Sequence, residues 1–141
     1  MFATETIQEA PKILLHDHLD GGLRPSTIIE LAEQTGNKEL PTYDKDELAN
    51  WMISTANRRN LELYLEAFTH TISVMQTRAA LYRVAAECAE DLALDGVIYA
   101  EIRFAPELHL MGDLKVAEVI ESVLAGLEAG SEGKDININV L

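Results

Sequence analysis

The apolar residues of this chain form one short continuous run at residues 13–15, alternate with polar residues in two further short segments, and recur with a helical period in longer ones. The short segments 13–15, 97–104 and 136–141 predict three β-strands. Helices are predicted at residues 25–33, from Asp44 through Trp51, from Asn60 through Phe68, from Thr77 to Gly96 and from Asp113 to Gly130. Strands that are separated by long helical crossovers are typical of a parallel sheet covered by helices.

Segment 97–104 alternates strictly between apolar and polar residues. Ile98, Ala100, Ile102 and Phe104 form one face, and Tyr99, Glu101 and Arg103 form the other. In a sheet covered by helices the polar face must line an interior that tolerates charge. A barrel lumen with Glu101 and Arg103 as neighbours meets this requirement, and the solvent-exposed face of an incomplete sheet explains the pattern equally well.

The order strand, helices, strand, helix, strand is the beginning of a β/α series. Three strands cannot close a β/α barrel, which typically has eight strands and about 250 residues. We therefore expect an α/β fold in which residues 1–141 form a single, incomplete β/α-barrel domain, the N-terminal portion of a barrel with about three parallel strands. The unpaired strand edge predicts that the isolated chain precipitates, self-associates or binds the missing C-terminal portion.

The composition of the chain limits its partners and its compartment. Eleven basic and twenty-four acidic residues give a net charge of -13, which opposes binding to nucleic acid polymers and to anionic membrane surfaces. Cys88 is the single cysteine and lies in an apolar helical pattern, so we expect a buried thiol. No secretory signal pattern and no long apolar run is present in the sequence, and we expect a cytoplasmic protein.

The densest group of chemically active residues is segment 16–22, His-Asp-His-Leu-Asp-Gly-Gly, directly after the first apolar run. If this run is a strand, His16 and His18 project to the same side and converge on one point. Neutral imidazole is a good zinc ligand, but two histidines supply only half of a tetrahedral shell. His70 and His109 are not on a strand beside the pair, although His109 can reach the barrel mouth from the loop after Pro106.

Two segments resemble a known family. Residues 11–25 resemble the N-terminal signature of adenosine deaminases, in the adenosine and AMP deaminase group of the amidohydrolase superfamily, and residues 97–106 resemble the family's second strand. The resemblance begins at Pro11 and covers only the N-terminal portion of a family member. It implies a TIM (β/α)8 barrel that binds one Zn²⁺ ion and deaminates adenosine and 2'-deoxyadenosine hydrolytically, to inosine with release of ammonia.

The resemblance also implies roles for individual residues. The positions of His16 and His18 bind zinc, and those of His18 and Asp20 contact the nucleoside, where the carboxylate accepts a hydrogen bond from the ribose. Leu61, Tyr64, Leu65 and Phe68 match a mobile apolar gate, although an apolar stripe at helical spacing is equally consistent with plain core. Glu101 and Arg103 match structural positions.

No catalytic residue is expected within this chain. The remaining zinc ligands of the family, its glutamate proton shuttle and its base-orienting histidine come from later strands, so we expect the isolated chain to be inactive. Two alternatives stay open: a catalytically dead fragment that acts as a metal-binding or interaction module, and a related deaminase that acts on adenine, AMP or a modified nucleoside.

Overall fold

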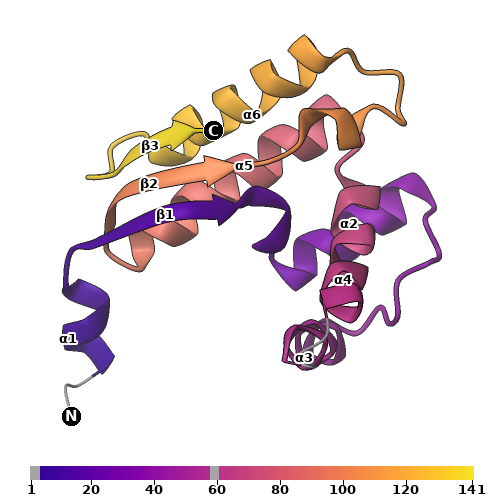
Figure 1. Ribbon diagram of the computed structural model, residues 1–141, viewed down its shortest axis with the longest axis horizontal. Helices are drawn as coiled ribbons and strands as arrows, with labels where there is room; N and C mark the ends of the chain where they lie inside the picture. The colour runs from indigo at the N-terminus through magenta and orange to yellow at the C-terminus, as the bar shows by residue number, and fades with distance from the viewer. Residues whose placement is uncertain (1–3, 58–60) are drawn as a thin grey trace.

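The computed structural model describes residues 4–57 and 61–141, and its centre is a three-stranded parallel sheet (Figure 1). The strands are β1 (Lys12–His18), β2 (Val97–Arg103) and β3 (Asn137–Val140), in the spatial order β1-β2-β3. Each neighbouring pair is parallel, as the helical crossovers between them predicted. The expected α/β fold with three parallel strands is therefore confirmed.

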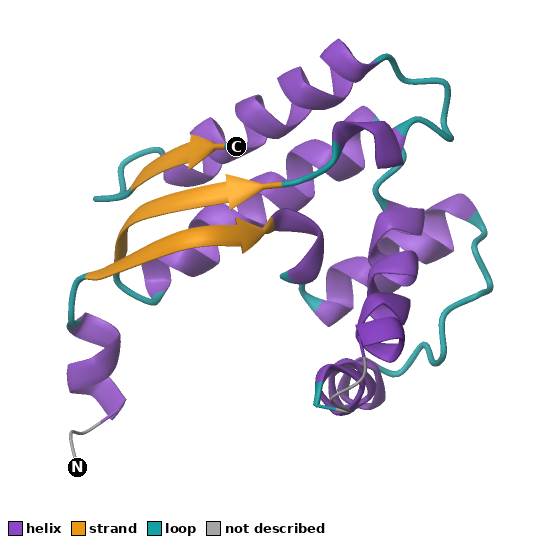
Figure 2. Cartoon of the chain, viewed as in Figure 1, coloured by secondary structure: helices purple, strands orange, loops and turns teal. Residues whose placement is uncertain are grey.

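The helices form two groups around this sheet. They are α1 (Thr4–Glu9), α2 (Pro25–Thr35), α3 (Lys45–Ala56), α4 (Leu61–Val74), α5 (Arg78–Leu94) and α6 (Val116–Ser131), with the 3-10 turns η1 (Leu19–Gly21) and η2 (Pro106–His109). Helices α5 and α6 cover one face of the sheet, whereas α2, α3 and α4 gather beyond the carboxyl ends of the strands (Figure 2). None of the helices in the described part is long and apolar enough to cross a membrane.

Helix caps that depend on neighbouring residues were predicted correctly. Asp44 Oδ1 accepts hydrogen bonds from the backbone N–H groups of Asp46 and Glu47, at 3.0 and 2.9 Å. Thr77 Oγ1 accepts one from the N–H of Ala80 at 3.1 Å. These bonds satisfy N–H groups that have no partner in the first turn of a helix. The predicted cap at Asn60 lies outside the described residues.

The predicted start of α6 at Asp113 is wrong. Asp113 has a φ of 63° and lies before the helix, which begins three residues later. The side chain of Glu118 accepts a hydrogen bond from the N–H of Lys115 at 2.8 Å and so satisfies the first turn instead. The later start of α6 results from a contact with a distant part of the chain. Gln76 Oε1 accepts a hydrogen bond from the N–H of Met111 at 3.0 Å, and this bond holds the segment before α6 against the end of α4.

Helix α6 packs unusually close to α5 because of two glycines. A Cβ atom on Gly126 would overlap the carbonyl oxygen of Tyr82, and one on Gly130 would overlap that of Ala86. Only glycine therefore allows the two backbones to approach this closely. The contact fixes the helical layer against which β2 lies.

Strand β2 has the two faces that its sequence predicted, except that Ile98 of the apolar face is 43% exposed. Ala100 and Ile102 are fully buried and Phe104 nearly so, on the side of the helices. On the opposite face Glu101 Oε1 accepts a hydrogen bond from the hydroxyl of Tyr99 at 3.0 Å, whereas Arg103 contacts His16 on β1. Glu101 and Arg103 therefore lie two residues apart on the same face of β2, but each contacts another residue rather than the other.

Candidate functional site

A β-bulge near the end of β1 determines where its histidines point. Leu14 pairs with Ala100 and Asp17 pairs with Ile102, so that three steps along β1 match two steps along β2. His16 lies within this irregularity and has a φ of 59°, which is uncommon for a residue with a side chain. The extra residue shifts the alternation of the strand by one position.

The bulge places both histidines on the face away from the helices. Leu14 packs against the core, so a regular strand would turn His16 and His18 toward the same core. Instead Asp17 occupies the core side, where burial raises the pKa of its carboxyl group. The pKa of the Cys88 thiol is raised to about 12, mainly by burial and in addition by the negative charge of Asp17. The two histidines therefore lie on the same side of the strand, as the alternation from His16 to His18 predicted, and the bulge determines which face of the sheet that is. Cys88 packs against the core but is only partly buried, so the predicted buried thiol is confirmed only in part.

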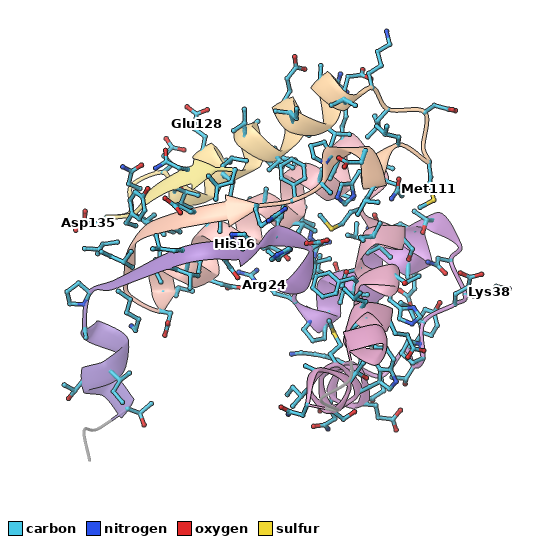
Figure 3. The ribbon with its side chains drawn as sticks, in the orientation of Figure 1. His16, Arg24, Lys38, Met111, Glu128 and Asp135 are labelled. Carbon is cyan, nitrogen blue, oxygen red and sulfur yellow. The ribbon has the colours of Figure 1, made fainter. Side chains whose placement is uncertain are left out.

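The two imidazoles are arranged as a pair of metal ligands would be. Their ring centroids are 5.5 Å apart with an angle of 54° between the planes, and Figure 3 labels His16 near the carboxyl end of β1. Arg103 Nη1 lies 3.0 Å from His16 Nε2. Because a guanidinium group has no acceptor, Arg103 donates this bond, and Nε2 carries the lone pair that a metal would use.

The pair alone does not complete a metal site. Two imidazole nitrogens fit half of a tetrahedral zinc shell, in which zinc–nitrogen distances are about 2.0–2.1 Å. Within residues 4–57 and 61–141, no group of three or more His, Cys, Asp or Glu side chains is placed to hold a metal ion. A metal ion held by this pair would need further ligands from outside the part of the chain that the structure describes.

Asp20 places a buried carboxylate beside the histidines. The residue lies in η1 and is 5% exposed, and its Oδ1 is 3.7 Å from His18 Nδ1. Oδ1 has no hydrogen-bond partner among the described residues. A buried polar atom without a partner is costly, so this oxygen is suited to accept a hydrogen bond from a ligand.

A cavity of about 330 Å³ lies between His18, Asp20 and the apolar helix α4. It is lined by His18, Asp20, Leu65, Phe68, Ile72, Arg103, Phe104, Ala105 and Leu108. The ring of Phe68 meets His18 edge-on at 6.1 Å, and Leu65 is half exposed. This volume is in the range of small-molecule sites. Two of the four predicted gate residues therefore line the same cavity as His18 and Asp20, whereas the side chains of Leu61 and Tyr64 lie outside the described part.

Arg24 anchors the chain that follows the site. Its guanidinium donates to both carboxylate oxygens of Asp91, at 2.9 and 2.7 Å, and to Glu90 at 3.0 Å. The hydrogen bonds to Asp91 are the main cause that raises the pKa of Arg24. Figure 3 labels Arg24 just beyond the turn that follows β1. These bonds tie the segment after Asp20 to α5.

The other two histidines are not metal ligands in this arrangement. His70 packs edge-on against Trp51 at 5.3 Å. His109, which the sequence allowed to reach the barrel mouth, is instead fully buried, and its Nδ1 lies 3.1 Å from the carbonyl oxygen of Met75. Sequence reasoning also treated Arg103 as structural, although its position on the polar face of β2 was a signal that it lies beside the site.

The model of the adenosine deaminase family matches residues 11–141, which include the histidine pair, Asp20 and the cavity. The chain belongs to the adenosine deaminase family. It is 54% identical to the adenosine deaminase of Mycobacteroides abscessus over 96% of its own length and 39% of that relative. The chain thus spans about two fifths of the length of the curated relatives it matches.

Solved structures of the adenosine deaminase family and its wider group have the same fold. An N6-mAMP deaminase from Arabidopsis matches with a TM-score of 0.76 at 29% identity, over 97% of this chain and 42% of that one. An amidohydrolase from Burkholderia ambifaria with bound Zn matches with a TM-score of 0.77 at 20% identity, over 97% and 36% of the two chains. The three strands and their helices therefore correspond to the N-terminal part of a TIM barrel.

Proposed function

We propose that this chain supplies the first zinc ligands and the first nucleoside contact of a zinc-dependent adenosine deaminase, which converts adenosine and 2'-deoxyadenosine to inosine with release of ammonia. The observation that carries the proposal is the bulged end of β1, where two imidazoles lie 5.5 Å apart and one of them, His18, lines a cavity together with Asp20, whose buried Oδ1 has no hydrogen-bond partner among the described residues. Membership of the adenosine deaminase family supports this assignment.

His16 and His18 would hold the metal through ring nitrogens. In His16 the metal would take the place of Arg103, which donates a hydrogen bond to Nε2 in this structure. When bound, a zinc ion lowers the pKa of a water molecule toward about 7, which makes a nucleophile available at neutral pH for attack on the purine carbon that bears the amine.

Asp20 accepts a hydrogen bond from a ribose hydroxyl and so fixes the orientation of the nucleoside, which is a positioning role. Leu65 and Phe68 line the cavity on the side of α4 and exclude water from it.

We further propose that the chain works in the cytoplasm, with a nucleoside as its small-molecule partner and with neither nucleic acid nor a membrane surface. The net charge of -13 and the presence of a single cysteine, Cys88, support this. The chain by itself is expected to be inactive, because the described residues supply only two nitrogen ligands.

The test is a hybrid enzyme in which residues 11–141 replace the matching part of the Mycobacteroides abscessus adenosine deaminase. We expect one zinc ion per molecule and ammonia release from adenosine. His16→Asn and His18→Asn should each lower the bound zinc and abolish turnover, whereas the control His70→Asn, whose ring packs on Trp51, should do neither. Full zinc occupancy in both site variants would contradict the proposed ligands.

The same hybrid separates the alternatives. Zinc binding without deamination of any purine substrate would favour a metal-binding or interaction module. A higher kcat/KM for adenine, AMP or N6-methyl-AMP than for adenosine would assign the chain to a related deaminase.

A further inference from the structure

The cavity beside His18 and Asp20 has two apolar walls that come from different parts of the chain. One wall belongs to α4 and the other to the segment that follows β2. The lining residues are Leu65, Phe68 and Ile72 in α4 and Phe104, Ala105 and Leu108 after β2. Because the two walls are distant along the chain, the width of the cavity depends on the contacts that hold one wall against the other.

The side chain of Gln76, two residues after the end of α4, joins the two walls. Its Nε2 donates a hydrogen bond to the carbonyl oxygen of Ile72 at 2.8 Å and another to that of Leu108 at 3.0 Å. Each of these acceptors belongs to a residue that lines the cavity, one on each wall. Gln76 is only 9% exposed, and hydrogen bonds in such a buried position are costly to lose.

The partners of the Gln76 amide determine its orientation. An amide group has two donor hydrogens on nitrogen and an acceptor oxygen. Oε1 accepts from the N–H of Met111 at 3.0 Å, while Nε2 faces the two carbonyl oxygens. The opposite orientation would place an oxygen against two oxygens. Among side chains of similar length, glutamate lacks the pair of donors and methionine lacks both donors and acceptor, so neither can make the whole set of bonds.

Two further contacts bring the segment after β2 close to the end of α4. His109 is fully buried, and its Nδ1 donates to the carbonyl oxygen of Met75, 3.1 Å away, because a carbonyl oxygen only accepts. A Cβ atom on Gly112 would overlap the carbonyl oxygen of Gln76, so the two backbones lie in direct contact. The junction around Gln76 is therefore closely packed, which fixes the position of its amide.

We propose that Gln76 is a positioning residue for the substrate, because its amide holds Ile72 and Leu108 at a fixed separation and so sets the width of the cavity. A cavity whose walls are already in place does not lose binding free energy in ordering them around the ligand. The inference rests on the proposed function for the identity of the ligand, whereas the bridge between the walls is a property of the fold.

Two substitutions in the hybrid enzyme separate the bridge from the rest of the Gln76 side chain. Gln76→Met keeps the length and loses all three hydrogen bonds. Gln76→Glu keeps an oxygen for the N–H of Met111 but cannot donate to both carbonyl oxygens. We expect each variant to raise the KM for adenosine about three- to tenfold and to change kcat less than about twofold, because the bridge holds the walls rather than the reacting atoms. An unchanged KM in either variant would overturn the inference.

Ser122→Ala is the matched control for stability. The hydroxyl of Ser122 donates to the carbonyl oxygen of Glu118 at 2.7 Å within α6, and Ser122 is 7% exposed but does not line the cavity. Its substitution should lower the free energy of unfolding in urea, as Gln76→Met does, and leave the KM for adenosine unchanged. A KM that rises with instability in Ser122→Ala as well would mean that Gln76 acts only through stability.

Hydrogen exchange of the hybrid without substrate distinguishes failure of this inference from failure of the proposed function. In Gln76→Met, peptides from residues 65–75 and from residues 105–111 should both exchange about fivefold faster or more, whereas Ser122→Ala should leave both as in the parent. Faster exchange in only one of the two segments, or in neither, refutes the bridge even if the hybrid is a deaminase. Faster exchange in both supports the bridge even if the hybrid releases no ammonia.

Discussion

Gly126 offers a quantitative test of the helical layer that supports the site. In an isolated helix, replacing glycine by alanine is stabilising by about 1 kcal/mol. Here the new Cβ would overlap the carbonyl oxygen of Tyr82 and lie 2.8 Å from the Cβ of Ala85. Overpacking of this kind typically costs about 1–3 kcal/mol after the structure relaxes. We therefore expect Gly126→Ala to lower the free energy of unfolding by up to about 2 kcal/mol, since the steric cost is offset in part by the helix propensity of alanine.

The assay is urea unfolding of the hybrid enzyme followed by circular dichroism, with Gly22→Ala as the matched control. Gly22 has nothing within 4 Å of an added Cβ and has an ordinary φ of -111°, so its substitution should change stability by less than about 0.5 kcal/mol. If Gly126→Ala were instead more stable than the parent, the helix propensity would dominate. The close approach of α5 and α6 would then be refuted.

Three further predictions concern other parts of the chain. The pKa of the Cys88 thiol is raised from 9.0 to about 12 in the folded state, so the unfolded chain loses this proton first as the pH rises. The free energy of unfolding should therefore fall between pH 9 and 12. Urea titrations at several pH values should show that Cys88→Ser lacks this part of the decline. Phe68→Ala removes one wall of the cavity and should raise the KM for adenosine in the hybrid severalfold, whereas Leu124→Ala, at a side chain 48% exposed on α6, should not. The 141-residue chain should self-associate in sedimentation experiments, because Ile13 and Leu15 on β1 are 66% and 60% exposed, and a monodisperse monomer would contradict this.

Local signals predicted much of the fold. Asp44 and Thr77 cap helices through bonds to residues two or three positions away, and such bonds can be recognised in a short window of sequence. Asp113 was misplaced because the start of α6 depends on Gln76, more than thirty residues earlier. Helix α1 was not predicted.

The site shows the same division between local and distant information. His16, His18 and Asp20 stand in one short segment whose resemblance to a family was visible in the sequence. The contact between Arg103 and His16 depends on the register of β2 against β1, and the burial of His109 depends on the docking of η2 against the end of α4. Neither can be inferred from spacing, because each joins residues that are distant along the chain.

In a regular strand, the side on which Leu14 packs would also fix the side on which His16 and His18 lie, and the extra residue in β1 makes these two orientations independent. Because Leu15 and His16 together face a single residue of β2, omitting Leu15 would restore ordinary pairing, with Leu14 and Asp17 still toward the helices and both imidazoles still on the opposite side. The strand can therefore lose one residue at this point without inverting its ligands. Deletion of Leu15 should therefore be tolerated far better than deletion of Asp17, which lies between the two histidines.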